Sequence, residues 1–281
     1  MRWLTERRRR RILAQPFPAA WDEIIDREVA ISHRLDPKSR YRLRDLVQVF
    51  IAEKHWEGCG GLELTEEMQV VIAAQACVLV LGRDLSLYDD VASILIYPSA
   101  MRTAPRRLGL FEQPHAPIAN GHAIEGEAHL GGPVIVAWDT ALAGAREEVP
   151  GNVVFHELAH KLDMANGAID GTPPLANRHL RRRWKAVCEA AFADLRRRVE
   201  AGWPSAIDAY GATNEAEFFA VATETFLTRP VELAAAYPAL YELLAGFYRM
   251  RMQLQPPGQP PAGVVARESP PQASATSGQH D

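Results

Sequence analysis

Apolar residues recur at intervals of three and four along the first part of the chain, which is the period of one helix face. Residues 19–35 and 38–56 show this spacing. A third segment follows Thr65, whose hydroxyl can cap a helix N-terminus, and it ends at Gly82. The pattern predicts three helices, and the third, apolar on most sides, is expected to be buried.

Two short apolar runs have a different character. Residues 93–97 (SILIY) end at a proline, and residues 133–138 (PVIVAW) follow two glycines. Both runs are rich in β-branched or aromatic side chains, which favours strands. The connection between them is crowded with Pro and Gly and reads as a loop. It carries His115, His122 and His129 at irregular spacing, and we expect these to be surface or loop residues.

Helical spacing returns from residue 150 onward. It predicts helices over residues 152–164, 175–201, 214–227 and 231–254. After Gln255 the chain is dominated by Pro, Gly, Ser and Gln, so it cannot bury enough surface to offset the entropy of ordering. We therefore expect a basic N-terminal extension (1–14), one folded domain (15–255) and a disordered Pro-rich tail (256–281).

The composition is that of an ordinary globular protein. The chain has 281 residues, of which 47% are hydrophobic and 23% charged, which excludes collagen-like, coiled-coil and largely disordered proteins. A net charge of -4 disfavours a generic nucleic-acid binder, and we expect the arginine run at residues 7–11 to be solvated. The longest apolar passage, residues 70–81, is far shorter than the ~20 residues of a bilayer span.

Cysteine usage indicates a compartment. Cys59, Cys77 and Cys188 are odd in number and widely spaced, which fits neither a disulfide framework nor a CxxC metal site. Such usage favours a reducing environment. We expect a cytoplasmic protein with neither a membrane nor a nucleic acid as partner.

The strongest chemical signal lies in the helix predicted over residues 152–164. His156 and His160 are four residues apart, so they project from one face and both imidazoles can ligate one zinc ion. Glu157 between them can act as general base on a water whose pKa the zinc lowers. Two histidines on a helix can also be ordinary core groups, but the spacing, the helix and the chemistry agree on a zinc site.

The sequence pattern alone does not identify the third zinc ligand. Catalytic zinc sites usually have three protein ligands, and the sequence after His160 lacks the HxxGxxH extension that would add a histidine. A carboxylate from a later helix is the next option, with Glu215, Glu217 and Glu224 as candidates. Glu217 also stands three residues after Asn214, as in a capping box, so it has an equally good structural role. Spacing alone allows either Glu217 or Glu224.

Four blocks of the sequence resemble those of one known family. They are LIYP at 95–98, GPVIVAW at 132–138, HELAHKLDMANG at 156–167 and IDAYGATNEAEFFAVATETF at 207–226. In order and spacing they are similar to the Mlc titration factor A family, also called DgsA anti-repressors. These are zinc metallopeptidases of the gluzincin kind, similar in their catalytic region to anthrax lethal factor. The resemblance covers roughly residues 15–255 and leaves out the arginine-rich start and the tail.

The resemblance implies a fold and a set of site residues. The implied fold is a mainly helical α+β, zincin-like metallopeptidase domain with a small sheet beside the HELAH helix. His156, His160 and Glu217 match the zinc ligands, and Glu157 matches the general base. Tyr210 matches a tyrosine that stabilises the oxyanion of the tetrahedral intermediate.

Two functions follow from the resemblance. The first is Zn²⁺-dependent hydrolysis of peptides, of aminopeptidase type, in which the strand at 133–138 would align the substrate by edge pairing. The second is a binding protein that sequesters a glucose-linked transcriptional repressor, Mlc, without covalent chemistry. Asp163 and Asn166 also lie in a matching block, but we leave them outside the catalytic set.

Overall fold

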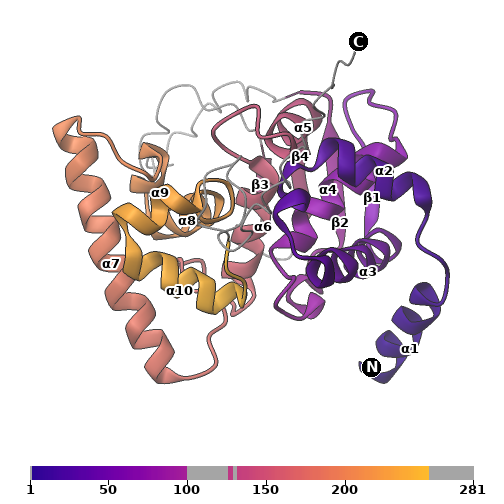
Figure 1. Cartoon of the computed structure of the whole chain (residues 1–281), viewed down its shortest axis with the longest axis horizontal. Helices are drawn as coiled ribbons and strands as arrows, with labels where there is room; N and C mark the ends of the chain where they lie inside the picture. The colour runs from indigo at the N-terminus through magenta and orange to yellow at the C-terminus, as the bar shows by residue number, and fades with distance from the viewer. Residues whose placement is uncertain (1, 100–125, 129–131, 253–281) are drawn as a thin grey trace, which may run out of the picture.

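The computed structural model describes residues 2–99, 126–128 and 132–252 (Figure 1). The segment predicted to be a disordered tail and the three loop histidines at 115, 122 and 129 lie outside these ranges.

The first helices form one side of the molecule (Figure 1). They are α1 (Arg2–Leu13), α2 (Ala19–Glu28), the 3₁₀ helix η1 (Ala30–Arg34), α3 (Pro37–Glu53) and α4 (Glu66–Val78). The single helix predicted over 19–35 is interrupted at Val29, whose φ of -115° and ψ of 84° are not helical. The prediction for α4 is confirmed, because Thr65 accepts a hydrogen bond from the backbone of Met68 and the helix is buried.

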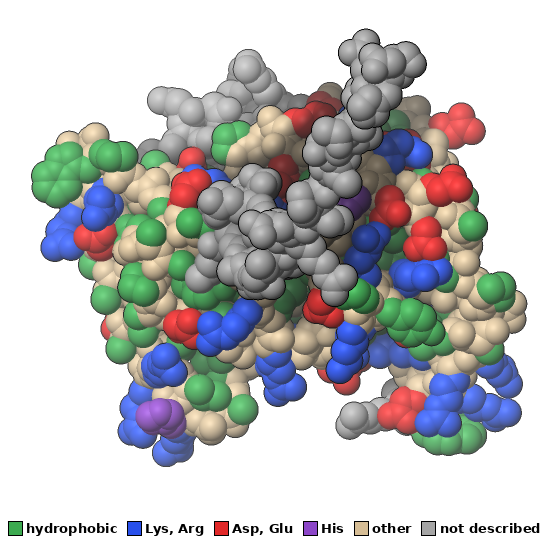
Figure 2. Space-filling view, viewed as in Figure 1, with side chains coloured by type: hydrophobic (Ala, Val, Ile, Leu, Met, Phe, Trp, Pro, Cys, Tyr) green, Lys and Arg blue, Asp and Glu red, His purple; other side chains and the backbone are tan. Residues whose placement is uncertain are grey.

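The arginine-rich start forms α1, which packs against α3. Arg9 contacts Glu53 at 2.8 Å and Asp89 at 3.3 Å. The other arginines of the run 7–11 are exposed, as expected, and Figure 2 shows Lys and Arg side chains gathered at this corner of the molecule.

A four-stranded sheet lies beside these helices. It has the order β1-β2-β4-β3, from β1 (His55–Gly58), β2 (Ser93–Tyr97), β4 (Val134–Ala137) and β3 (Gly126–Ala128). The first three strands are parallel, and β3 pairs antiparallel with β4. The strand predictions at 93–97 and 133–138 are confirmed, whereas β1 was expected to be the end of a helix and β3 part of a loop.

The position of β4 corrects one functional expectation. This strand has β2 on one side and β3 on the other, so its backbone groups are already paired. The expectation that residues 133–138 align a peptide by edge pairing is therefore wrong. A strand can add a further partner only along an unpaired edge.

The remaining helices complete the fold. After the 3₁₀ helix η2 (Leu85–Tyr88) and the sheet come α5 (Trp138–Ala145), α6 (Val153–Met164), α7 (Arg178–Ala201), the 3₁₀ helix η3 (Ala209–Ala212), α8 (Glu215–Thr228), α9 (Pro230–Ala236) and α10 (Pro238–Tyr248). The single helix predicted over 231–254 is wrong, because it divides at Tyr237. Pro238 lacks a backbone N–H and disfavours helical geometry in the residue before it.

Helix α6 is the centre of this arrangement. It packs against α8, α4, α5 and the strands β3 and β4, and Phe155, Leu158 and Leu162 are almost fully buried. The expected fold class, mainly helical α+β with a small sheet beside this helix, is confirmed. The packing fixes both the position and the rotation of the helix that carries His156 and His160.

Two further observations concern the cysteines and the lengths of the helices. Cys59, Cys77 and Cys188 are free cysteines. Across the described ranges, no helix has the length and the apolar character needed to cross a bilayer.

A polar cluster joins α7 to the turn between α9 and α10. The carboxylate of Asp194 accepts hydrogen bonds from Arg198 at 2.6 Å, Arg197 at 2.7 Å and the Tyr237 hydroxyl at 3.0 Å. The bond from Arg198, supported by those from Arg197 and Tyr237, lowers the pKa of Asp194 to about 2.

This shift predicts a pH-dependent stability. A carboxyl whose pKa is lowered by folding stabilises the protein above its unfolded pKa of about 3.9, and this contribution is lost as the pH falls towards the folded value. We expect Asp194→Asn to unfold at a lower urea concentration than the wild type near neutral pH, with the difference closing between about pH 4 and about pH 2. A difference that stays constant over this interval would contradict the assignment.

Candidate metal centre

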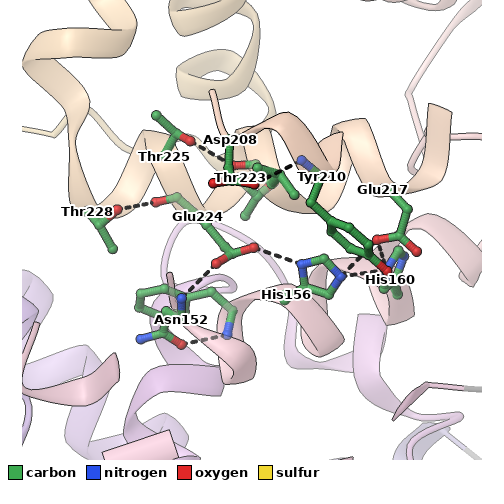
Figure 3. Close-up of polar contacts among 12 residues, drawn as sticks. Asn152, His156, His160, Asp208, Tyr210, Glu217, Thr223, Glu224, Thr225 and Thr228 are labelled. Carbon is green, nitrogen blue, oxygen red and sulfur yellow. Dashed lines mark hydrogen bonds and ion pairs between the residues drawn. The ribbon is translucent and has the colours of Figure 1, made fainter. Parts of the chain in front are cut away.

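Two capped helices bring the predicted site residues together. Asn152 caps α6 by accepting a hydrogen bond from the backbone of Phe155 at 2.9 Å, and Asn214 caps α8 by accepting one from the backbone of Glu217 at 2.9 Å. The second bond uses only the N–H of Glu217, so its carboxylate is left to face His156 and His160 (Figure 3). The capping role and the proposed ligand role of Glu217 are therefore compatible.

Three ligand-type atoms converge between α6 and α8. The Nε2 atoms of His156 and His160 are 3.1 Å apart, and Oε2 of Glu217 lies 3.0 Å from the first and 3.4 Å from the second. Ligand atoms on a tetrahedral zinc with bonds of about 2.0–2.1 Å are separated by about 3.3–3.4 Å. The three atoms thus have the spacing of a set that holds one ion.

The donor chemistry also fits a metal. Two imidazole nitrogens and one carboxylate oxygen form the one group of three or more such ligands in the described residues that could hold a metal ion. Imidazole suits first-row divalent metals, and a His₂Glu set with one open position occurs in catalytic zinc sites. The residues present therefore fit a divalent cation.

In this cluster, burial and neighbouring charges shift the pKa values in opposite directions. Burial lowers the pKa of His156, but its contacts with Glu217 and Glu224 outweigh that effect and raise the pKa above the ordinary value. Burial likewise raises the pKa of Glu217, and its contacts with His156 and His160 outweigh it and lower the pKa. A metal ion that binds here must displace a proton from His156.

Glu224, the alternative ligand, lies on the opposite side of the His156 ring. Its Oε1 atom is 2.7 Å from Nδ1 of His156, and its Oε2 accepts a hydrogen bond from the backbone of Asn152 at 2.6 Å. A carboxylate at Nδ1 holds the ring so that Nε2 faces the metal, as is common around metal-binding histidines. Glu215, the third candidate, is exposed and outside the ligand group. Helical spacing places Glu224 on the same face of α8 as Glu217, but spacing does not reveal that Glu224 contacts Nδ1 of His156.

Glu157 and Tyr210 lie at a cavity beside the cluster. Together with His156 they help to line a cavity of about 620 Å³, and Glu157 is only 4% exposed. Tyr210 lies in η3, and its ring centroid is 5.9 Å from that of His156. Burial and the charge of Glu217 raise the pKa of Tyr210 to about 12, so the phenol keeps its proton at neutral pH.

Asp163 and Asn166 hold the loop that follows α6. Asp163 is buried and accepts a hydrogen bond from the backbone of Gly171 at 2.9 Å, and burial is the main cause that raises its pKa to about 6. Asn166 bonds the carbonyl of Thr172 and the backbone N–H of Ala168. These contacts give both residues a structural role in the loop that follows α6.

Comparison with known proteins gives consistent matches along most of the chain. The sequence profile of the glucose-regulated metallo-peptidase M90 family matches residues 3–249. The matched range includes the arginine-rich start, so the expectation that this segment lies outside the family pattern is wrong.

Individual relatives agree with the profile. An uncharacterized protein of Synechocystis sp. is 34% identical over 255 residues, covering 88% of this chain and 89% of that protein. Mlc titration factor A of Klebsiella pneumoniae strain 342 is 30% identical over 233 residues, covering 82% and 85%. Mlc titration factor A of Serratia proteamaculans is 29% identical over 256 residues, covering 88% and 91%. The resemblance to the Mlc titration factor A relatives is confirmed, and the chain belongs to the glucose-regulated metallo-peptidase M90 family.

Proposed function

We propose that this protein is a zinc-dependent peptidase of aminopeptidase type. The observation that carries the proposal is the convergence of His156, His160 and Glu217 at 3.0 to 3.4 Å from one another, beside Glu157 and Tyr210 at the edge of a cavity. A HExxH helix with a glutamate from a later helix is the ligand pattern of the gluzincins. The family match supports the same chemistry.

Each residue has a defined task in this proposal. His156 and His160 through Nε2, and Glu217 through Oε2, would hold the ion. When bound, zinc would supply Lewis acidity that lowers the pKa of a nearby water and polarises a peptide carbonyl. Glu157 takes the proton from the attacking water and passes it to the leaving amine. Tyr210 donates a hydrogen bond from its phenolic O–H to the carbonyl oxygen of the substrate as that oxygen gains charge.

The cavity supports a small substrate. Its volume of about 620 Å³ lies within the ~300–1,000 Å³ range of small-molecule sites. Apolar side chains from Val149, Val153 and Val221 contribute to its wall and suit short peptides with apolar residues.

A peptide digest tests the proposal directly. Zinc-loaded protein is incubated with a library of short peptides, half with free and half with acetylated N-termini, and the products are identified by mass spectrometry. We expect removal of the first residue from free N-termini, loss of this cleavage with a chelator and recovery with zinc. Cleavage of internal bonds in acetylated peptides would contradict the aminopeptidase type but not the peptidase function. Absence of any chelator-sensitive cleavage would contradict the peptidase function.

Tyr210→Phe separates oxyanion stabilisation from metal binding. The substitution keeps the ring against His156 but removes the phenolic donor. We expect kcat to fall on the order of 10²-fold, because one donor to the developing charge is lost, while zinc content stays at the wild-type value. The measurements are kcat and zinc per chain on the same preparation. Loss of zinc together with activity would show that Tyr210 serves the ligand Glu217 instead.

A second candidate function is the binding of a transcriptional repressor. The relatives at 29–30% identity over most of the chain are named Mlc titration factor A. That name supports a role in which this protein sequesters an Mlc-like repressor. Such binding would depend on surface complementarity and would not require the metal chemistry.

A further inference from the structure

A chain of buried hydrogen bonds leads from His156 to the helix α4 on the other side of α6. Glu224 contacts His156 and accepts a hydrogen bond from the backbone N–H of Asn152 at 2.6 Å. The side-chain Nδ2 of Asn152 donates to Oε1 of Gln75 at 2.7 Å. Asn152 is 2% exposed and Gln75 is 0% exposed, so the bond between their side chains is shielded from water, whereas the two bonds of Glu224 are partly buried.

The carbonyl partners of Gln75 determine the orientation of both side-chain amides, those of Gln75 and Asn152. Its Nε2 donates to the backbone carbonyls of Val71 at 3.1 Å and Ala141 at 3.3 Å, which can only accept. Oε1 of Gln75 must therefore be the atom that faces Asn152. Since Asn152 then has to present Nδ2, its Oδ1 is left to cap α6 at the backbone of Phe155. Rotating either amide by half a turn would place two donors or two acceptors opposite each other.

The backbone around the chain leaves little room for adjustment. A Cβ atom on Gly151 would lie 3.2 Å from Oε2 of Glu224, and one on Gly144 would lie 3.2 Å from Cα of Asn152. Both glycines thus allow the segment before α6 to approach its neighbours closely. Asn152 is held on one side by Gln75 and on the other by Glu224.

We propose that Gln75 is a positioning residue for the metal centre. It selects the orientation of the Asn152 amide. Asn152 in turn sets the first turn of α6 and holds the Glu224 carboxylate against Nδ1 of His156. This inference rests on the proposed metal site, but not on peptide hydrolysis. Outer partners of metal ligands, such as Glu224 here, change metal affinity by about 10–100-fold, and Gln75 acts two hydrogen bonds further out, so we expect an effect at the lower end of that range.

Zinc affinity is the measurement that tests this role. Gln75→Leu keeps the size of the side chain but removes the acceptor for Asn152. We expect the dissociation constant for zinc, measured by competition with a chromophoric chelator, to rise about 10-fold. Gln75→Glu keeps an acceptor oxygen for Asn152. As the neutral acid that full burial favours, its hydroxyl can also donate to the carbonyl of Val71 or Ala141, so the affinity should return to within about twofold of the wild type.

A control separates positioning from general destabilisation. Ile72 is a fully buried residue of the same helix, and its aliphatic side chain cannot form hydrogen bonds. Ile72→Ala should therefore lower the free energy of unfolding without removing any of the hydrogen bonds between His156 and Gln75. Unfolding free energies are measured for all variants. We expect Ile72→Ala to lose stability and keep wild-type zinc affinity. An equal loss of zinc affinity in Ile72→Ala, or none in Gln75→Leu, would overturn the proposal.

Three further outcomes are distinguished by the same measurements. If Gln75→Leu does not fold, Gln75→Met, with its flexible apolar side chain, replaces it in the same comparison. If the wild type itself binds no zinc, the proposed metal site fails, and this inference fails with it. If the wild type and Gln75→Leu bind zinc equally well, only the role of Gln75 fails.

Discussion

Glu157→Gln is expected to abolish peptide turnover while the metal stays bound. Glutamine preserves the size of this buried side chain and leaves His156, His160 and Glu217 in place, but it cannot take a proton from water. Loss of a general base costs on the order of 10²–10⁴-fold in rate. The measurements are kcat on a cleavable peptide and zinc per chain. Wild-type turnover in this variant would contradict the proposed role of Glu157 as general base.

The same variant separates the two candidate functions. Binding of a purified Mlc-like repressor, measured in parallel, should be unaffected by Glu157→Gln because it does not draw on transition-state stabilisation. Lost turnover with intact repressor binding would show two separable activities on one fold. Glu215→Gln provides the matched control, because Glu215 is exposed at the start of α8 and outside the ligand group. It should change neither property.

Glu217→Ala is expected to remove most of the metal affinity. It deletes one of three protein ligands, so zinc should bind more weakly by more than the 10–100-fold that loss of an outer partner costs. The dissociation constant is measured by chelator competition, with Glu215→Ala from the same helical turn as the control. Glu224→Ala should weaken zinc less, since Glu224 contacts Nδ1 of His156 and not the metal position. A larger loss in Glu224→Ala than in Glu217→Ala would reverse the two assignments.

The local chemistry of the site could be predicted from the sequence. The four-residue spacing of His156 and His160 is a property of one helix, and α6 places both where the spacing requires. The choice of Glu217 over Glu224 could not be made from spacing, because both lie on the same helix and face α6. It depends on which carboxylate meets Nε2 and which meets Nδ1, and that is set by how α8 packs against α6.

In the fold, too, elements with local sequence signals could be predicted, and elements that depend on distant contacts could not. The helix at α4 and the strands β2 and β4 have strong local signals in capping, breakers and β-branched residues. Strand β1 has only four residues and exists because it pairs with β2, so no local pattern revealed it. The bond between Gln75 and Asn152 joins residues 77 positions apart, and a glutamine in an apolar segment gives no sign of its partner.

The proton held by His156 bears on the order in which the chain folds and acquires its metal. Without an ion, the imidazolium of His156 lies between the carboxylates of Glu217 and Glu224, so the buried charges are compensated from within the protein. The interior around them is formed by apolar side chains of α4, α6 and α8, which need no metal to pack. Small zinc domains, by contrast, unfold when the metal is removed. We therefore expect this domain, unlike such small domains, to keep its fold whether or not a cation is bound.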